Sequence, residues 1–428
     1  MEPAESVAYA VVVEGLLDVL ALSRAFEAVC RAHPVFTGCI RSGDAGHELV
    51  VGEGRGVPAV RVRAGDGDPA AGRGLDHAEE LIGLEVSRAG DCSTVTLLTD
   101  HTIADATASV ALLAELWGHY TDLVETGLPT PIGVFPIPQS LESLLARRGV
   151  TRLARNGVEA LFEPVTRRPV WPEAVSPAVA SPTAEPALPV HRRIRLTADA
   201  TAALARLGRA NGISVHGLTS AAVMIAHAKA AAGGPNDVVV PFMYPVDVRT
   251  RISPPVDALA GTNIFGTAGF KRSVGANTDP LLLAKALLAE LDASITDGVV
   301  QQSQLHLTGQ DQDRSAPAGT PVALSADTTM LTNWGRIPDL RTPAGLTIED
   351  FRGAILSQRL RPPAGATPGE PPAPTSGATP GEPPAPTSTY IVTTFNGRLS
   401  AELATAHCAP RADDIVSALD ETIHQMTT

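Results

Sequence analysis

The sequence is poor in cysteine, and its cysteines form neither a metal-binding pattern nor a disulfide framework. It has four, with no CxxC pair among them: Cys30, Cys39, Cys92 and Cys408. Isolated thiols of this kind are typical of a reducing compartment. The amino terminus is acidic before its apolar part, unlike a signal peptide, and no uncharged run reaches the length of a membrane helix. We therefore expect a soluble, cytoplasmic protein.

Positive charge is also scarce. The chain has 33 Lys and Arg against 46 Asp and Glu, which gives a net charge of −13. This balance argues against a nucleic acid or an anionic membrane surface as the main partner. The chain also lacks a GxSxG elbow, a Walker motif and a dinucleotide-binding glycine fingerprint. These absences disfavour the Ser-His-Asp hydrolases and the common nucleotide-binding folds.

The length of 428 residues predicts two domains or lobes. We expect an N-terminal lobe over 1–163, a proline-rich linker over 164–190 and a C-terminal lobe over 191–428. The C-terminal lobe contains the segment GATPGEPPAPTS twice in tandem, within about 362–388. A duplicated proline-rich segment cannot bury apolar surface, so it predicts a disordered surface loop. The stretches on either side of it, 348–358 and 389–406, both indicate strands.

Hydrophobic periodicity predicts alternating strands and helices. Residues 7–15 indicate a strand, and residues 18–33 a helix that Asp18 caps and Pro34 ends. The stretch CSTVTLLTDH at 92–101 has the alternation of a strand, and helical spacing follows it directly. His101 is therefore expected at the end of a strand, and Asp105 just before a helix.

His101 and Asp105 are the strongest candidates for chemistry. An imidazole with a pKa near neutrality can take a proton from a hydroxyl as it attacks a carbonyl. A carboxylate four residues later would more readily fix the loop than relay protons, and it would need a buried cation as partner. Arg249 and Arg251, at the end of a strand in the second half, are both available.

A metal site is the competing interpretation of this stretch. Asp100, His101 and Asp105 are three possible ligands within six residues. However, no His- or Cys-rich stretch supplies a fourth ligand, so we expect no metal.

Together these residues resemble the condensation-domain and HxxxD acyltransferase superfamily, whose usual signature is HHxxxDG. The resemblance is closest to the Pap (polyketide-associated protein) family of phthiocerol/phthiodiolone dimycocerosyl transferase-like enzymes. Four further stretches carry it in the family's order along the chain, at 17–36, 244–263, 332–343 and 390–402. It implies an α/β (α+β) chloramphenicol-acetyltransferase-like fold of two lobes. Each lobe would be a mixed sheet flanked by helices, with the active site in a channel between them.

The resemblance also implies roles for individual residues. His101 is the expected general base, Asp105 is structural, and Arg249 is the first choice as its partner. Asn333, Trp334 and Gly335 correspond to a loop near the channel, a possible oxyanion region; a packed tryptophan beside a tight turn explains them equally well.

Two residues depart from the family motif. Asp100 stands in place of its first histidine and Ala106 in place of its glycine. An acidic neighbour is expected to raise the pKa of His101. The added methyl group of Ala106 is expected to narrow the route of the acyl donor.

We accordingly expect an O-acyltransferase of secondary metabolism. It would move a short or branched acyl group from a thioester to a hydroxyl of a polyketide-type acceptor, for example in acetylation of a macrocyclic antibiotic. Acyl-CoA or an acyl carrier protein would be the partner that supplies the acyl group through its phosphopantetheine arm. No tightly bound cofactor is expected, and the chain is expected to be a monomer. A non-catalytic binding protein on the same fold and an amide-forming condensation enzyme are the alternatives.

Overall fold

The computed structural model describes most of the chain outside its proline-rich segments. The described residues are 5–43, 46–52, 56–65, 67–128, 130–131, 133–158, 189–231, 237–307, 328–357 and 388–428. Apart from their last residues, the predicted linker at 164–190 and the duplicated segment at about 362–388 lie outside them.

The described chain divides into two compact units. Unit 1 is formed within Met1–Val150, Arg249–Ile264 and Arg336–Pro362, and unit 2 within Thr151–Val248, Phe265–Gly335 and Pro363–Thr428. Two segments from the second half of the chain therefore belong to unit 1, so neither unit is one continuous stretch of sequence.

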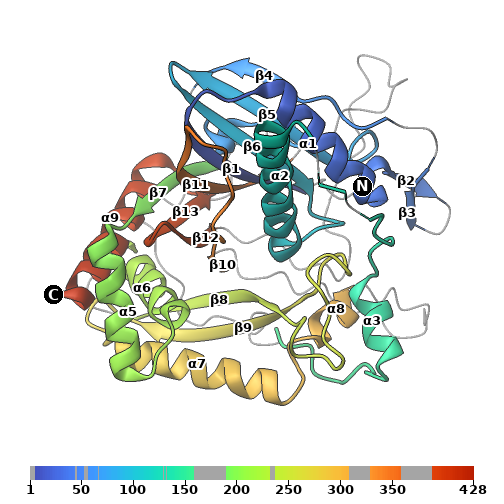
Figure 1. Cartoon of the computed structure of the whole chain (residues 1–428). Coiled ribbons are helices and arrows are strands. Elements are labelled where there is room, and N and C mark those ends of the chain that lie inside the picture. The colour runs from blue at the N-terminus through green and yellow to red at the C-terminus, as the bar shows by residue number, and fades with distance from the viewer. Residues whose placement is uncertain are drawn as a thin grey trace, which may run out of the picture. The chain divides into compact units, whose positions relative to one another are not determined.

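Unit 1 is built on a mixed five-stranded sheet in the order β11-β1-β6-β5-β4 (Figure 1). Its strands are β1 (Glu5–Gly15), β4 (Arg61–Ala64), β5 (Ile82–Ala89), β6 (Cys92–Asp100) and β11 (Leu346–Ser357). Neighbours pair antiparallel, except that β4 and β5 pair parallel. The first strand is thus joined to a strand more than 300 residues later, with Glu5 opposite Ser357.

Helices and short elements complete unit 1. Helices α1 (Val19–Ala32) and α2 (Ala106–Thr126) pack against each other beside the sheet (Figure 1). A separate hairpin pairs β2 (Cys39–Gly43) with β3 (Gly46–Val50). The remaining described elements are α3 (Leu141–Arg147) and the 3-10 turns η1 (Pro34–Thr37) and η2 (Pro69–Ala71).

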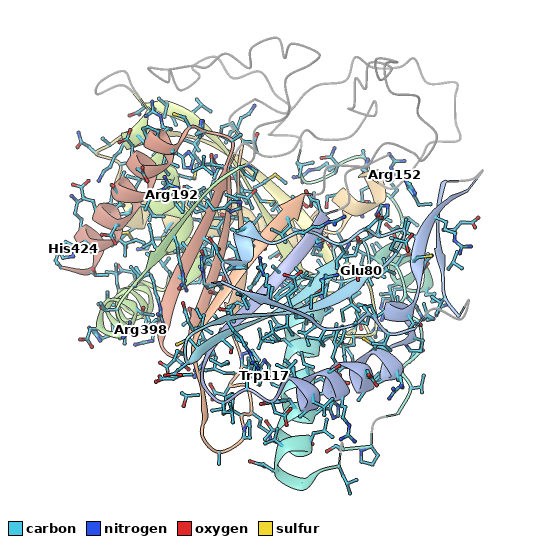
Figure 2. All side chains as sticks on the ribbon, turned by 90° about the horizontal axis from the view of Figure 1, so that it is seen from above. Glu80, Trp117, Arg152, Arg192, Arg398 and His424 are labelled. Carbon is cyan, nitrogen blue, oxygen red and sulfur yellow. The ribbon has the colours of Figure 1, made fainter. Side chains whose placement is uncertain are left out.

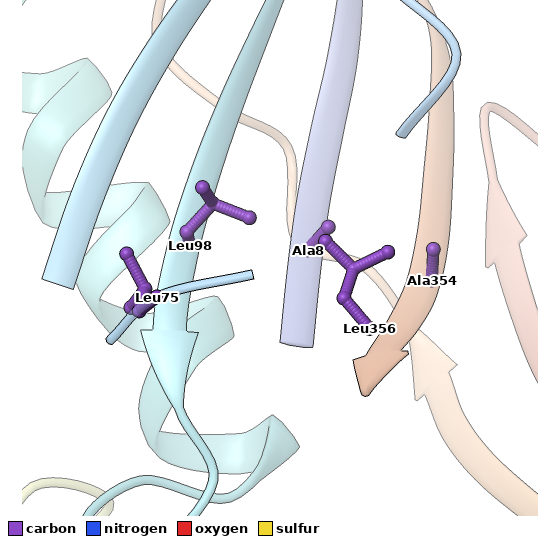
Figure 3. Packing of buried hydrophobic residues seen from close by; sticks show 5 residues of the cluster. All are labelled: Ala8, Leu75, Leu98, Ala354 and Leu356. Carbon is purple, nitrogen blue, oxygen red and sulfur yellow. The ribbon is translucent and has the colours of Figure 1, made fainter. Parts of the chain in front are cut away.

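One face of the unit 1 sheet carries a small apolar cluster that joins strands distant in sequence. Figure 3 shows its members, which come from β1, β6, β11 and the segment before β5: Ala8, Leu75, Leu98, Ala354 and Leu356. All are almost completely buried. Trp117 on α2 (Figure 2) is likewise fully buried. The centroids of its ring and of the Tyr120 ring lie 5.4 Å apart in an edge-to-face arrangement. Burial of each leucine side chain of the cluster stabilises the unit by about 1.5–3 kcal/mol.

Unit 2 is built on a mixed six-stranded sheet in the order β7-β13-β12-β10-β8-β9. Its strands are β7 (Val190–Arg195), β8 (Val238–Asp247), β9 (Phe265–Val274), β10 (Thr329–Arg336), β12 (Ser388–Phe395) and β13 (Arg398–Thr405). The helices of this unit are α5 (Ala198–Asn211), α6 (Val215–Ala230), α7 (Pro280–Thr296), α8 (Gln302–Leu307) and α9 (Ala409–Thr427). Each unit is therefore a mixed sheet with helices, which confirms the predicted α/β fold class.

Side-chain caps explain where several helices begin. The carboxylate of Asp18 accepts hydrogen bonds from the backbone N–H groups of Leu20 and Ala21, as predicted for the start of α1. Thr197 and Ser214 cap α5 and α6 in the same way. Such caps satisfy N–H groups that have no partner within the helix and contribute typically about 1 kcal/mol each.

Candidate active site

His101 lies in a short turn that connects β6 to α2. Its backbone N–H donates to the carbonyl oxygen of Glu5 on the neighbouring strand, at 2.8 Å. The N–H groups of Ile103 and Ala104 both donate to the carbonyl of Asp100, at 3.2 and 3.3 Å. The turn is therefore tied to the sheet at its start and closed on itself before the helix begins.

The imidazole of His101 is partly exposed, and one of its nitrogens faces the turn. Nδ1 lies 3.3 Å from the carbonyl oxygen of Ala104. A carbonyl oxygen only accepts hydrogen bonds, so this contact places the proton of the neutral ring on Nδ1. Nε2 is then the nitrogen with a lone pair, and it is the basic atom of the side chain.

Asp105 has a structural position at the start of α2. Its Oδ1 caps the helix by accepting from the N–H of Ala108 at 3.0 Å. Both carboxylate oxygens accept from the guanidinium of Arg249, at 2.8 and 3.0 Å. Oδ2 also accepts from the N–H of Ile264 at 2.9 Å. With four hydrogen bonds, the carboxylate is fully used in holding the backbone, which leaves it no part in proton relay.

Arg249 neutralises that carboxylate in a buried setting. Arg249 is 4% exposed and Asp105 is 5% exposed. The guanidinium also donates to the carbonyl of Ala258 at 3.2 Å, and the N–H of Val256 donates to the carbonyl of Arg249 at 3.1 Å. A bidentate pair of this kind is stronger and more directional than a neutral hydrogen bond. It fastens the segment 249–264 to the turn that carries His101, whereas Arg251, the other candidate, is exposed.

Asn263 was not predicted as a site residue, although it contacts the His101 turn directly. Its side-chain amide donates to the carbonyl oxygen of His101 at 2.5 Å and lies 3.4 Å from that of Thr102. It therefore fixes the backbone of His101 itself. The only sequence signal was its place at the end of the 244–263 stretch that carries the family resemblance.

The two residues that depart from the family motif have clear structural settings. Asp100 is fully buried; its Oδ1 accepts from the N–H of Thr102 at 2.9 Å, and Oδ2 lies 4.0 Å from Nδ1 of His77. Ala106 is the first residue of α2 and is partly exposed. Among the described residues other than glycine, only Asn396 has a positive φ, so the backbone at position 106 does not require glycine.

The remaining predicted residues belong to unit 2. Asn333, Trp334 and Gly335 lie at the end of β10, with Asn333 exposed. The Oδ1 of Asn333 accepts from the N–H of Gly335 at 2.8 Å, and Gly335 has a φ of +73°. The structure thus brings His101, Asp105 and Arg249 together in unit 1 and places the Asn333–Gly335 turn in the other unit.

A small apolar cavity adjoins the His101 turn within unit 1. Its volume is about 20 Å³. Residues of the turn, of the first turns of α2 and of neighbouring segments line it, among them His33, Phe36, Ile103, Ala104, Ala108 and Leu112. Ala104 is common to the cavity and the turn, because it lines the cavity and its carbonyl oxygen faces His101 Nδ1. The space suffices for about one or two methyl-sized groups.

The described residues contain neither a metal-binding cluster nor a helix of membrane-spanning character. Across those residues, no three or more His, Cys, Asp and Glu side chains gather in a way that would hold a metal ion. Within the same ranges, no helix has the length and apolar character needed to cross a membrane.

Known proteins share both the sequence and the fold of this chain. Residues 185–404 match the family model for the phthiocerol/phthiodiolone dimycocerosyl transferase C-terminus. Transferases of that name are 33% identical over 346 residues in Mycobacterium tuberculosis and 33% identical over 347 residues in Mycobacterium leprae. Each alignment covers 79% of this chain and 79% of the relative.

Solved structures agree with this relationship. Polyketide synthase associated protein 5 from Mycobacterium tuberculosis matches with a TM-score of 0.75 and 27% identity, over 99% of this chain and 94% of that one. The first condensation domain of the CDA synthetase matches with a TM-score of 0.61 and 13% identity, over 99% of this chain and 90% of that domain, which shows a common fold. The chain belongs to the phthiocerol/phthiodiolone dimycocerosyl transferase family and is an acyltransferase with a condensation-domain-like fold.

Proposed function

We propose that this protein is an O-acyltransferase that uses His101 as its general base. It transfers a short or branched acyl group from the thioester of acyl-CoA or of an acyl carrier protein to a hydroxyl of a polyketide-type alcohol. The observation that carries the proposal is the contact of His101 Nδ1 with the Ala104 carbonyl oxygen at 3.3 Å. This contact supports a neutral ring with its proton on Nδ1, in which Nε2 would act as the base.

The surroundings of His101 suit a base that must be held rigidly. Asp105 and Arg249 fasten the helix start to the segment 249–264, and Asn263 of that segment binds the His101 carbonyl. General base catalysis requires the base to lie within hydrogen-bond reach of the proton that it abstracts. A fixed turn maintains that geometry without any need for Asp105 to contact the substrate.

The proposed reaction conserves atoms and charge. His101 Nε2 takes the proton of the acceptor hydroxyl as its oxygen attacks the thioester carbonyl carbon. The resulting tetrahedral intermediate expels the thiolate by breaking the carbon–sulfur bond, and the imidazolium returns the proton to sulfur. The products are an ester and a free thiol, and the base is regenerated.

The cavity beside the turn supports a short acyl group. Its volume of about 20 Å³ and its apolar walls, including Ile103 and Leu112, accommodate the end of an acetyl or propionyl group. The similar transferases are named for mycocerosyl transfer to phthiocerol or phthiodiolone. From these relatives we infer a polyketide-type acceptor for this protein as well. Acetylation of a macrocyclic antibiotic is one specific form of it.

Thiol release from a series of acyl-CoA donors tests the mechanism. Donors from acetyl-CoA to long-chain acyl-CoA would be offered with an alcohol acceptor, and the free thiol and the ester would both be measured. We expect transfer that prefers short chains and that falls roughly a hundred- to ten-thousandfold in His101→Asn and His101→Ala. The same series would be run with an acyl carrier protein as donor and with an amine as acceptor.

A matched control separates the role of His101 from the effect of losing any histidine. His424 is exposed on α9 (Figure 2), so His424→Asn should leave transfer unchanged. If His101→Asn retained full ester formation with a thioester that the wild-type protein uses, the assignment of His101 as general base would be wrong.

A further inference from the structure

Two polar side chains contact each other in unit 2, and neither has a role in the proposed acyl-transfer mechanism. His216 lies in the first turn of α6, and Asn333 lies on β10. Nδ2 of Asn333 is 3.5 Å from Nδ1 of His216, although 117 positions separate the two residues in the sequence. The contact places the start of α6 beside the end of β10.

The turn at Asn333 determines which of its side-chain atoms faces the histidine. Oδ1 accepts a hydrogen bond from the N–H of Gly335 at 2.8 Å, so the amide nitrogen is directed to the other side. An amide NH₂ group only donates, and it therefore requires Nδ1 of His216 to be the unprotonated nitrogen. The proton of the neutral imidazole is then on Nε2, which makes Nε2 a hydrogen-bond donor.

The environment of His216 keeps its ring uncharged and fixes its orientation. Desolvation lowers the pKa of His216 to about 4, so the side chain is neutral at physiological pH. Its ring centroid is 4.5 Å from that of Tyr244, with an interplanar angle of 63°. The side chain nevertheless keeps part of its surface exposed. A neutral, oriented and partly exposed donor has the properties of a binding group.

A second histidine of the same helix shows what a purely structural histidine looks like here. His227 is 5% exposed, and its Nε2 lies 3.0 Å from the hydroxyl of Tyr390. Nε2 of His227 is therefore hydrogen-bonded inside the core. For Nε2 of His216, no hydrogen bond to another described residue is present.

We propose that His216, positioned by Asn333, is a binding site in unit 2 for an uncharged carbonyl or hydroxyl oxygen of a co-substrate. Imidazole and carboxamide N–H groups are neutral donors, and they suit a neutral oxygen better than a phosphate, for which a cation would be expected. Two co-substrates of the proposed reaction carry such oxygens: the pantetheine amides of the acyl donor and the polyketide-type acceptor. The inference rests on the proposed function and adds to it a group that binds substrate.

The test compares His216→Phe with His216→Gln, and with His227→Phe as the matched control in the same helix. Phenylalanine keeps a ring against Tyr244 but has no N–H group. Glutamine has no ring, but its side-chain amide places an N–H donor near the position of Nε2. The KM of the acyl donor, the KM of the acceptor, kcat and the melting temperature would be measured for each. We expect His216→Phe to raise one KM roughly three- to tenfold and His216→Gln to recover much of it.

The two possible ligands give different results. A raised KM for the acceptor, with unchanged thiol release into water, assigns the site to the acceptor; a raised KM for the acyl donor assigns it to the pantetheine arm. If wild-type protein transfers acyl groups but both KM values are unchanged in His216→Phe, the inference is wrong. It is also wrong if His216→Phe and His227→Phe merely lower kcat and the melting temperature alike. If the wild-type protein itself shows no transfer activity, the proposed function is wrong, whatever the effect of the His216 variants.

Discussion

His101 in unit 1 and His216 in unit 2 are two partly exposed histidines whose Nδ1 atoms face opposite kinds of partner. Nδ1 of His101 faces a carbonyl oxygen, that of Ala104, at 3.3 Å. Nδ1 of His216 faces an amide nitrogen, that of Asn333, at 3.5 Å. The first partner accepts and the second donates, so the two rings hold their proton on different nitrogens.

The difference shows how one type of side chain serves two purposes in one protein. With the proton on Nδ1, Nε2 of His101 has the lone pair and is suited to take a proton, whereas Nε2 of His216 has the hydrogen and is suited to bind an oxygen. Their supports differ as well. The His101 turn is held by a buried ion pair and by Asn263, while the Asn333 turn depends on one hydrogen bond to Gly335. His101 is thus the more firmly held of the two histidines.

Breaking the ion pair of Asp105 and Arg249 should have the largest effect on stability. In Asp105→Ala, Arg249 would remain 4% exposed in the native geometry without its carboxylate. An unpaired buried charge costs roughly 3–5 kcal/mol, so we expect a marked fall in the urea midpoint and in the melting temperature. The double variant Asp105→Ala/Arg249→Met should be less destabilised than the sum of its two single variants, because it leaves no charge behind.

An exposed ion pair supplies the control for this prediction. Arg31 and Glu27 lie 2.6 Å apart on α1, with side chains 68% and 42% exposed. Removal of Arg31 should cost less than about 1 kcal/mol. Equal losses in Arg31→Ala and Asp105→Ala would contradict the structural role given to Asp105.

Loss of the Asn263 side chain should affect catalysis more than folding. Asn263→Leu removes the hydrogen bond to the His101 carbonyl, which spans 2.5 Å. We expect kcat to fall roughly tenfold, since a displaced base loses its alignment while the ion pair still holds the segment. Asn211→Leu removes a similar bond, to the carbonyl of Leu207 in α5, and should leave kcat unchanged. Equal kcat values in Asn263→Leu and the wild type would exclude a positioning role.

The features that could be predicted from the sequence are those set by local interactions. The change from strand to helix around His101 follows from alternation at 92–101 and from Asp105, which caps α2. The strand segments at 348–358 and 389–406 and the cap at Asp18 were predicted on the same grounds. Each depends on residues only a few positions apart, where periodicity and capping chemistry are informative.

The features that could not be predicted depend on long-range pairing. Nothing local in β11 indicates that it pairs with β1, since any strand with the same alternation would suit that edge of the sheet. Asn263 reaches the His101 carbonyl across 162 positions, and His216 reaches Asn333 across 117. Such contacts arise only after the sheets have assembled, so spacing in the sequence gives no indication of them.

Filling the cavity beside the turn should sharpen the choice of acyl donor. Ala108 lines the cavity, is 3% exposed and lies in the first turn of α2. Ala108→Val adds two methyl groups to a space of about 20 Å³. We expect kcat/KM for propionyl-CoA to fall roughly tenfold relative to acetyl-CoA, because one methylene in an apolar pocket is worth about that much. Ala114→Val, at a partly exposed position of α2 that does not line the cavity, is the control. If both variants gave the same ratio of kcat/KM for propionyl-CoA and acetyl-CoA, the cavity would have no role in acyl selection.

Exchanging the partner of His216 should make that histidine resemble His101. In Asn333→Asp, one carboxylate oxygen can still accept from Gly335, and the other would face Nδ1 of His216 as an acceptor. We expect the proton to move to Nδ1 and the pKa of His216 to rise from about 4 towards its ordinary value near 6.5. A proton and nitrogen NMR titration of the ring would show both changes, whereas Asn333→Leu removes the donor without adding charge and should leave the pKa low.

The pH dependence of stability gives a second measure of the same exchange. The unfolded chain protonates His216 near pH 6.5, whereas the folded protein does so only near pH 4. Stability therefore declines as the pH falls from about 6.5 to 4, because the unfolded state binds the proton first. Asn333→Asp should make that decline shallower by raising the folded pKa, and Asn333→Leu should not. If the two variants gave the same slope and the same ring titration, the amide of Asn333 would not set the tautomer of His216, and the contrast with His101 would fail.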